Sequence, residues 1–189
     1  PEKVKAWFEK ATVVKQMSDS LFNYAQSLKE QIVREADGKD ADVTNIVGKD
    51  NIEAAAQVML APGTGQGGKL YNAINSYRER ILQMVTDPNQ KKLIADNLST
   101  EVPKKDNALG KNWQEYMFES MPVAAAVTLL SKLQSDIRYA EGEVLNQFLT
   151  NVDLGDLRVN LVDAFVVPQS RIVMRGTKYS ANIVLAAVD

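Results

Sequence analysis

Apolar positions along this chain follow a helical period over most of its length and a strand period near its end. From Tyr179 onward they recur at every second residue, as in a strand. Before about residue 152 they recur at steps of three and four, which places them on one face of a helix. The clearest helical series is Val123, Val127, Leu130, Leu133, Ile137, Ala140, Val144 and Phe148. We therefore expect a helical bundle domain at 1–155 and the beginning of a β domain at 156–189.

The first predicted helix, from about Glu2 to Ala36, is unusually long. At the standard rise it would measure on the order of 50 Å. A second stripe, which includes Phe8 and Gln31, predicts that this helix is covered on more than one side. Packing in an intramolecular bundle and pairing with a second copy both fit the pattern. The apolar or small residues at heptad spacing are Val4, Trp7, Ala11, Val14, Ser18, Leu21, Ala25, Leu28 and Ile32. The second stripe is Phe8, Met17, Tyr24 and Gln31.

Shorter helices and connectors are expected between this helix and a second long one. Asn51 is placed to cap a short helix, and Pro88 to open another at its first turn. The glycine-rich stretch 61–68 follows no strand and does not complete a phosphate-loop pattern, so we expect a mobile connector. Residues 99–111 are mostly polar and are expected to form a connection on the surface.

A dense group of aromatic and methionine side chains comes next. It falls in a short predicted helix that ends at Pro122, where the second long helix begins and continues to about Asn151. Aromatic and Met residues at helical spacing favour a place in the core, and the lining of a ligand pocket is the alternative. The group consists of Trp113, Tyr116, Met117, Phe118 and Met121.

Charged residues on the second long helix do not converge on one point. Arg138 and Glu141 are three residues apart, which suits an ordinary surface pair, whereas Glu141 and Glu143 do not face each other. Gly142 in the helix interior costs about 1 kcal/mol relative to Ala, and a close helix crossing would explain it. The charges on this helix include Lys132, Asp136, Arg138, Glu141 and Glu143.

The composition excludes many catalytic mechanisms. The 189 residues include no Cys and no His, so the sequence offers no thiolate nucleophile, no imidazole base and no usual zinc ligand set. A mechanism based on carboxylates or Lys stays open. The net charge of −2 arises from mixed charges without a basic block, which argues against a nucleic-acid partner. We name no catalytic residue, no cofactor-binding residue and no metal ligand, and we expect no cofactor.

The end of the chain predicts short strands at 159–167, 171–174 and 179–188. Two or three short strands are marginal alone, so we expect them to pair with residues outside this sequence or with another chain. The first residue is Pro1, not Met. We therefore expect this to be a fragment from which an N-terminal segment has been removed, together with any signal or membrane anchor.

Two segments resemble a known family. The order NWxxYxFExMPxxAAxxxLxxLxxDxRxxExxV, on Asn112 to Val144, and the tail DAFVVPQSRIVMRGTKYSANIVLAAVD are similar to the periplasmic part of the gliding-motility protein GldM and its counterpart PorM. The similarity is specific between about 112 and 189. From 1 to 111 only the helical character and the long first helix correspond.

The resemblance implies a component of the type IX secretion system. In that family a transmembrane helix, absent here, joins the inner-membrane partner GldL or PorL in a proton-driven motor. Further domains, also absent, reach the ring subunits GldK and GldN, or PorK and PorN, under the outer membrane. The family implies a homodimer in the periplasm that is anchored in the inner membrane. It also implies that the β part of this chain is the beginning of an immunoglobulin-like β-sandwich domain, truncated here after its first strands.

Three functions follow from these observations. A non-enzymatic, force-transmitting shaft subunit fits the long packed helices and the resemblance. A ligand-sensing periplasmic bundle of a receptor would use the aromatic group at 113–121 as the border of a pocket, although a β domain directly after the bundle is awkward for a receptor. An enzyme is supported only by the presence of Asp, Glu and Lys. Adhesins and other surface-assembly proteins are further alternatives.

Overall fold

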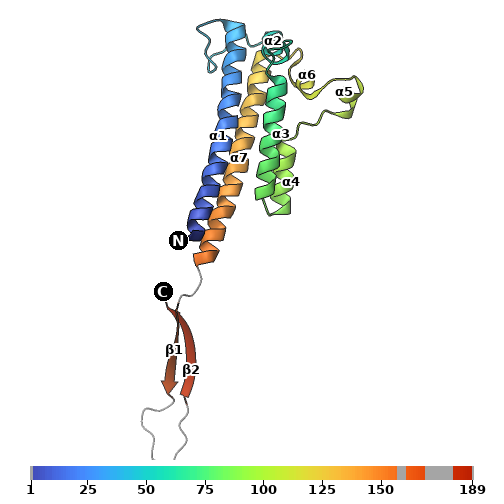
Figure 1. Ribbon diagram of the computed structural model, residues 1–189. Helices are drawn as coiled ribbons and strands as arrows, with labels where there is room; N and C mark the ends of the chain where they lie inside the picture. Colours follow the sequence, from blue (N-terminus) through green and yellow to red (C-terminus); the bar gives the residue numbers. More distant parts are fainter. Residues whose placement is uncertain (1, 157–160, 169–180, 189) are drawn as a thin grey trace, which may run out of the picture. The chain divides into compact units, whose positions relative to one another are not determined.

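Seven helices and one antiparallel pair of strands make up the described part of the chain (Figure 1). The computed structural model describes residues 2–156, 161–168 and 181–188, with side chains between residues 5 and 151. The chain divides into two units, Pro1–Leu149 and Thr150–Asp189. The predicted fold class, mainly α with a bundle built on two long helices, is confirmed.

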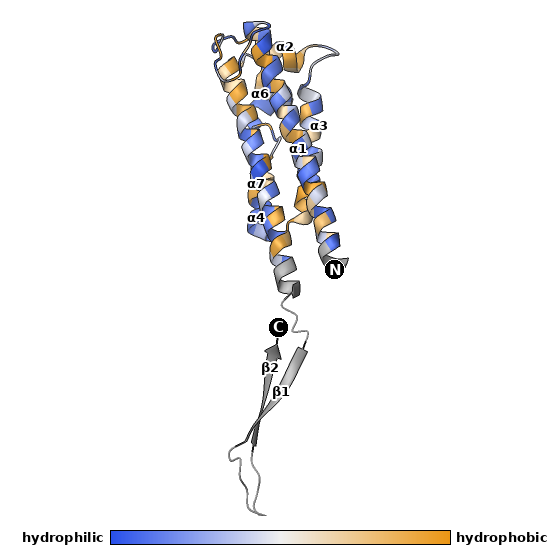
Figure 2. Cartoon of the chain, turned by 90° about the vertical axis from the view of Figure 1, so that its left-hand side faces the viewer, coloured by the Kyte–Doolittle hydropathy of each residue, from blue (hydrophilic) through white to orange (hydrophobic). Residues whose placement is uncertain are grey.

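The two long helices are α1 (Glu2–Asp37) and α7 (Val123–Asp156). They lie side by side and run in opposite directions (Figure 1). Most of the predicted heptad positions of α1 are buried, and so are most of the apolar positions of α7. Hydrophobic and hydrophilic residues alternate along both helices, as expected of helices that bury one face (Figure 2). Helix α7 extends five residues beyond the predicted end at Asn151.

Polar side chains tie α1 to α7 within this apolar contact. Two of them, Lys29 and Gln134, are only 8% and 5% exposed. We call the following contacts the polar seam. Lys29 Nζ donates to Ser131 Oγ at 3.1 Å, Gln134 Nε2 donates to Phe22 O at 3.1 Å and to Gln26 Oε1 at 3.3 Å, and Arg138 Nη1 donates to Asp19 Oδ1 at 2.7 Å. The hydrogen bond from Arg138 is the main cause that lowers the pKa of Asp19.

The loop that leaves α1 closes the far end of this pair. Asp37 accepts hydrogen bonds from the backbone N–H groups of Val47 and Gly48, at 2.8 and 2.7 Å. The carbonyls of Lys49 and Asn51 then accept from the N–H groups of Ala124 and Val123 at the start of α7. Since the first N–H groups of a helix have no partner within it, these bonds satisfy donors that α7 would otherwise leave unpaired.

The shorter helices α2 (Ala54–Leu60), α3 (Gly67–Met84) and α4 (Pro88–Asn97) follow. The predicted role of Asn51 is confirmed, because its side chain accepts from the N–H groups of Glu53 and Ala54 ahead of α2. Pro88 opens α4 as predicted, with Asp87 as its cap. Gln147 of α7 bonds Thr86 and the carbonyl of Met84, which fastens the turn between α3 and α4 to α7.

Tyr77 joins three helices through its hydroxyl group. The hydroxyl donates to the carbonyl of Ile137 in α7 at 3.2 Å and shares a 2.8 Å hydrogen bond with Ser18 Oγ in α1. Tyr77 and Ser18 are buried, and burial raises the pKa of Tyr77 to about 12. No buried side-chain nitrogen or oxygen in the described part of the chain lacks a hydrogen-bond partner.

The stretch 61–68 differs from its prediction as a mobile connector. It forms a tight turn in which Gly65 N donates to Ala61 O at 2.7 Å and Gln66 N donates to Val58 O at 3.1 Å. A Cβ at Gly65 would lie 2.7 Å from the carbonyl oxygen of Met59. Glycine is required here because backbone approaches backbone closely, not because the chain needs freedom.

The structure contradicts one further expectation for the helices and refines two others. An added Cβ at Gly142 would meet nothing within 4 Å, so no close helix crossing explains this glycine. The second stripe of α1 is covered only in part, because Phe8 is 72% exposed and Gln31 is exposed. The connection 99–111 contains a short helix, α5 (Lys104–Ala108), which its polar composition concealed.

In the second unit, strands β1 (Leu161–Pro168) and β2 (Ala181–Val188) pair antiparallel. Leu161 stands opposite Val188, and Pro168 opposite Ala181. The predicted strand at 171–174 lies outside the described residues. The immunoglobulin-like domain and the division at 155/156 stay predictions.

The substitution Leu28→Ala tests the core of the long pair. Leu28 is fully buried in α1, so the change should lower the free energy of unfolding by about 2–5 kcal/mol. Phe8→Ala on the same helix is the control, and its effect should stay within about 0.5 kcal/mol. Urea unfolding followed by circular dichroism measures both. A large loss for Phe8→Ala would contradict the exposure described for that side chain.

The substitution Tyr77→Phe tests the pH dependence that this buried tyrosine creates. Its folded pKa of about 12 lies above the value of 10.0 for an unperturbed tyrosine, so the unfolded state loses this proton first. The contribution is therefore complete below pH 10 and falls by roughly 1.4 kcal/mol per pH unit as the pH rises toward 12. Tyr77→Phe should make the alkaline loss of stability shallower in urea titrations, and an unchanged loss would contradict this pH dependence.

Candidate binding pocket

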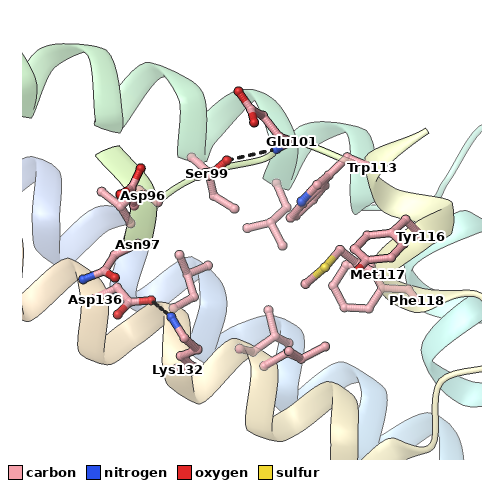
Figure 3. Close-up of a pocket in the computed structure, with 16 residues that line it drawn as sticks. Asp96, Asn97, Ser99, Glu101, Trp113, Tyr116, Met117, Phe118, Lys132 and Asp136 are labelled. Carbon is pink, nitrogen blue, oxygen red and sulfur yellow. Dashed lines mark hydrogen bonds and ion pairs between the residues drawn. The ribbon is translucent and has the colours of Figure 1, made fainter. Parts of the chain in front are cut away.

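The best-formed cavity in the described part of the chain has a volume of about 300 Å³ (Figure 3). Its walls come from α3, the end of α4 with the residues that follow, α6 (Trp113–Phe118) and α7. The apolar part of the lining is Leu70, Ile74, Leu98, Trp113, Met117, Phe118, Leu129, Leu130 and Leu133. The polar part is Asp96, Asn97, Ser99, Glu101, Tyr116, Lys132 and Asp136.

Helix α6 is short, and its local sequence holds it in place. Asn112 and Glu115 form a capping box in which each side chain accepts from the backbone N–H of the other at 2.9 Å. The ring of Trp113 lies 5.8 Å from that of Tyr71 and meets Phe118 edge-on at 6.1 Å. These contacts position the aromatic wall of the pocket.

A glycine sets the distance between α3 and α6. A Cβ built on Gly67 would lie 2.6 Å from Gln114 Cβ and 2.8 Å from the carbonyl oxygen of Met59. Since real Cβ atoms do not approach so closely, a larger residue would push α6 away from α3. Gly67 therefore allows the start of α3 to pack closely against α6.

Side chains of α3 hold the segment after α4 that closes the cavity. Arg78 donates to the carbonyl of Leu98 at 3.1 Å, where α4 has just ended. Thr100, which is buried, donates to Asn75 Oδ1 at 2.9 Å. The wall is thus fixed by hydrogen bonds to a helix of the bundle.

The pocket has an aromatic end and a polar end. Figure 3 shows Trp113, Tyr116, Met117 and Phe118 together on one side, with Asn97 and Asp136 on the other. Lys132 pairs with Asp136 at 2.6 Å. Three carboxylates and one ammonium group line the cavity; Asp136 is paired with Lys132 and Asp96 with Lys92, so Glu101 is the carboxylate of this lining without an ion pair within the described residues. The three carboxylates belong to Asp96, Glu101 and Asp136.

Both interpretations of the aromatic group apply, each to part of it. Trp113 and Phe118 are buried, as expected of core residues, but they also face the cavity. Tyr116 is 36% exposed and Met117 half-buried, as expected of a pocket wall. Sequence reasoning missed Leu70 and Asp96 because they lie far away in the chain, and no local motif marks them.

The charges noted on α7 fall at two places. Lys132 and Asp136 line the pocket. Arg138 contacts Glu141 at 2.6 Å, which confirms the predicted pair, but Glu141 is only 8% exposed and therefore not an ordinary surface residue. That the chain has no catalytic, cofactor-binding or metal-binding residue stays a prediction. Within the described residues, no group of three or more Asp or Glu side chains is arranged to hold a metal ion.

Two family models match the chain and together cover almost all of it. The GldM N-terminal domain matches residues 1–151, and the GldM second domain matches residues 153–189. No curated protein matches the chain. Among the described helices, none is both long enough and apolar enough to cross a membrane. Because the first family model alone covers more than half of the sequence, the chain belongs to the GldM family of gliding-motility and type IX secretion proteins.

Proposed function

We propose that this chain forms the helical first periplasmic domain, 1–155, and the beginning of the β-sandwich domain, 156–189, of a non-enzymatic shaft subunit. The subunit forms a homodimer and transmits mechanical energy from a proton-driven motor in the inner membrane to a ring associated with the outer membrane. Its membership of the GldM family supports a role in gliding and type IX secretion.

The pairing of α1 with α7 is the observation that carries this proposal. A part that transmits force must resist bending and sliding of its elements. Close-packed interiors have low compressibility, which supplies stiffness along the pair. The polar seam resists sliding, because a shift along the helix axis separates Lys29, Gln134 and Arg138 from their partners.

The proposed partners follow from the family. The inner-membrane partner is GldL or PorL, reached through a transmembrane helix outside this sequence. The ring subunits are GldK and GldN, or PorK and PorN, reached through further domains. We place the protein in the periplasm, anchored in the inner membrane.

The double substitution Gln134→Ala with Arg138→Ala tests the mechanical role. Introduced into the full-length protein in cells, it should reduce type IX secretion and gliding while the helical content of the purified chain stays unchanged. The reason is that α1 and α7 keep their apolar contact but lose three of the four contacts of the polar seam. Secretion assays, gliding speed and immunoblots of protein abundance are the measurements.

Gln57→Ala with Arg80→Ala is the matched control, because it removes the same side-chain types from exposed positions on α2 and α3. This control should secrete and glide normally. Normal secretion by the seam variant, at normal abundance and with a measurable loss of stability, would contradict the mechanical proposal.

A ligand-sensing bundle is the second candidate, and the cavity beside the aromatic group is the observation that favours it. A ligand at one hundred times its Kd would add roughly 2.7 kcal/mol to the free energy of unfolding. Under the shaft proposal we expect no free small molecule to stabilise the chain to that extent. A thermal-shift screen with small amphipathic compounds measures this, and one strongly stabilising compound would favour the second candidate.

A further inference from the structure

We infer that the cavity between α3, α4, α6 and α7 is a docking site for a segment of a partner protein. The segment inserts one large apolar side chain between Trp113 and Leu133 and sets basic residues beside the carboxylates of Asp96 and Glu101. This inference goes beyond the mechanical role and does not depend on it. Size, wall chemistry and charge each support it.

The volume of the cavity is compatible with one inserted side chain. Pockets for small molecules usually measure about 300–1,000 Å³, so a volume of about 300 Å³ stands at the lower limit. Such a space accepts one aromatic ring or branched aliphatic group. In protein interfaces, anchors of this kind fill small pockets and carry much of the binding energy.

The wall at the aromatic end can adapt to an inserted side chain. Met117 is half-buried, and its unbranched thioether can change conformation at low cost. Tyr116, at 36% exposure, presents a ring and a hydroxyl group at the mouth of the cavity. Trp113 lies deeper, at 7% exposure, and offers a large apolar face. These side chains form an apolar surface that water solvates poorly.

The charged side chains that line the cavity favour a basic residue. The carboxylate of Glu101 has no ion pair or hydrogen bond within the described residues, and its side chain is exposed. Asp96 pairs only with Lys92, in a contact where both side chains are more than 60% exposed and to which Arg could add. Asp136 is already paired with Lys132. An acidic segment would be repelled by the unpaired carboxylate of Glu101, whereas Lys or Arg gains an ionic contact with it.

Peptide binding to the purified chain tests the inference directly. The probe is a capped eight-residue peptide with one phenylalanine followed by two arginines. The chain has two tryptophans, so a ¹⁵N-labelled sample gives two indole signals. We expect the peptide to shift the Trp113 signal and leave Trp7, which contacts Phe148 elsewhere in the bundle, unchanged.

Two matched peptides separate the apolar and ionic contributions. Replacing the phenylalanine with alanine should abolish the shift, and replacing both arginines with glutamates should weaken binding. If all three peptides bind equally, or if none shifts the Trp113 signal at millimolar concentration, the inference is wrong. Phenethylamine is a further probe, and binding as tight as that of the peptide would assign the cavity to free amines instead.

Variants of the protein complete the test. Asp96→Asn with Glu101→Gln should weaken peptide binding roughly three- to tenfold, as expected for the loss of two exposed ionic contacts. Both side chains are exposed, so the fold should be unaffected. Glu79→Gln, on the face of α3 opposite Leu70, is the matched control and should bind as the unmodified chain does. An equal affinity for all three proteins would overturn the ionic part of the inference.

Discussion

The antiparallel contact between α1 and α7 is the constraint on which the rest of the bundle depends. It extends from the ring contact of Trp7 with Phe148 to the hydrogen bonds that Lys49 and Asn51 make with the start of α7. The shorter helices are attached to this pair and not to one another alone. Tyr77 fastens α3 to both long helices, and Gln147 fastens the turn between α3 and α4 to α7. Without the long pair, neither attachment has a partner.

Polar groups give this contact a definite register. Apolar side chains on two long helices tolerate a slip of one turn, since each finds another apolar neighbour. Lys29 and Gln134 do not, because a buried donor without an acceptor costs about 1–3 kcal/mol. A slipped pair would leave several such donors unpaired at once. The contact therefore has one favoured register instead of a series of similar ones, which is the property that a force-bearing pair requires.

The sequence predicted the features that depend on local chemistry. The long helices, the role of Asn51 and the start of α4 at Pro88 follow from periodicity, capping and backbone geometry within a few residues. Features that depend on distant contacts were missed. The glycines around Gly65 suggested a mobile connector, because the close approach of the Met59 carbonyl to Gly65 exists only in the folded chain. The sequence indicated only the aromatic wall of the pocket, and only as one of two alternatives. The other walls come from helices that are distant in the sequence.

Helix α7 serves two regions through two faces. Ser131, Gln134 and Arg138 face α1, whereas Leu129, Leu133 and Asp136 face the pocket. At 100° per residue these sets point in nearly opposite directions around the helix. Substitutions in one set share no partner with the other, so their effects on stability should add. One helix can thus bear load along its contact with α1 and present a docking surface on its other side, and a partner bound there need not disturb the register of the long pair.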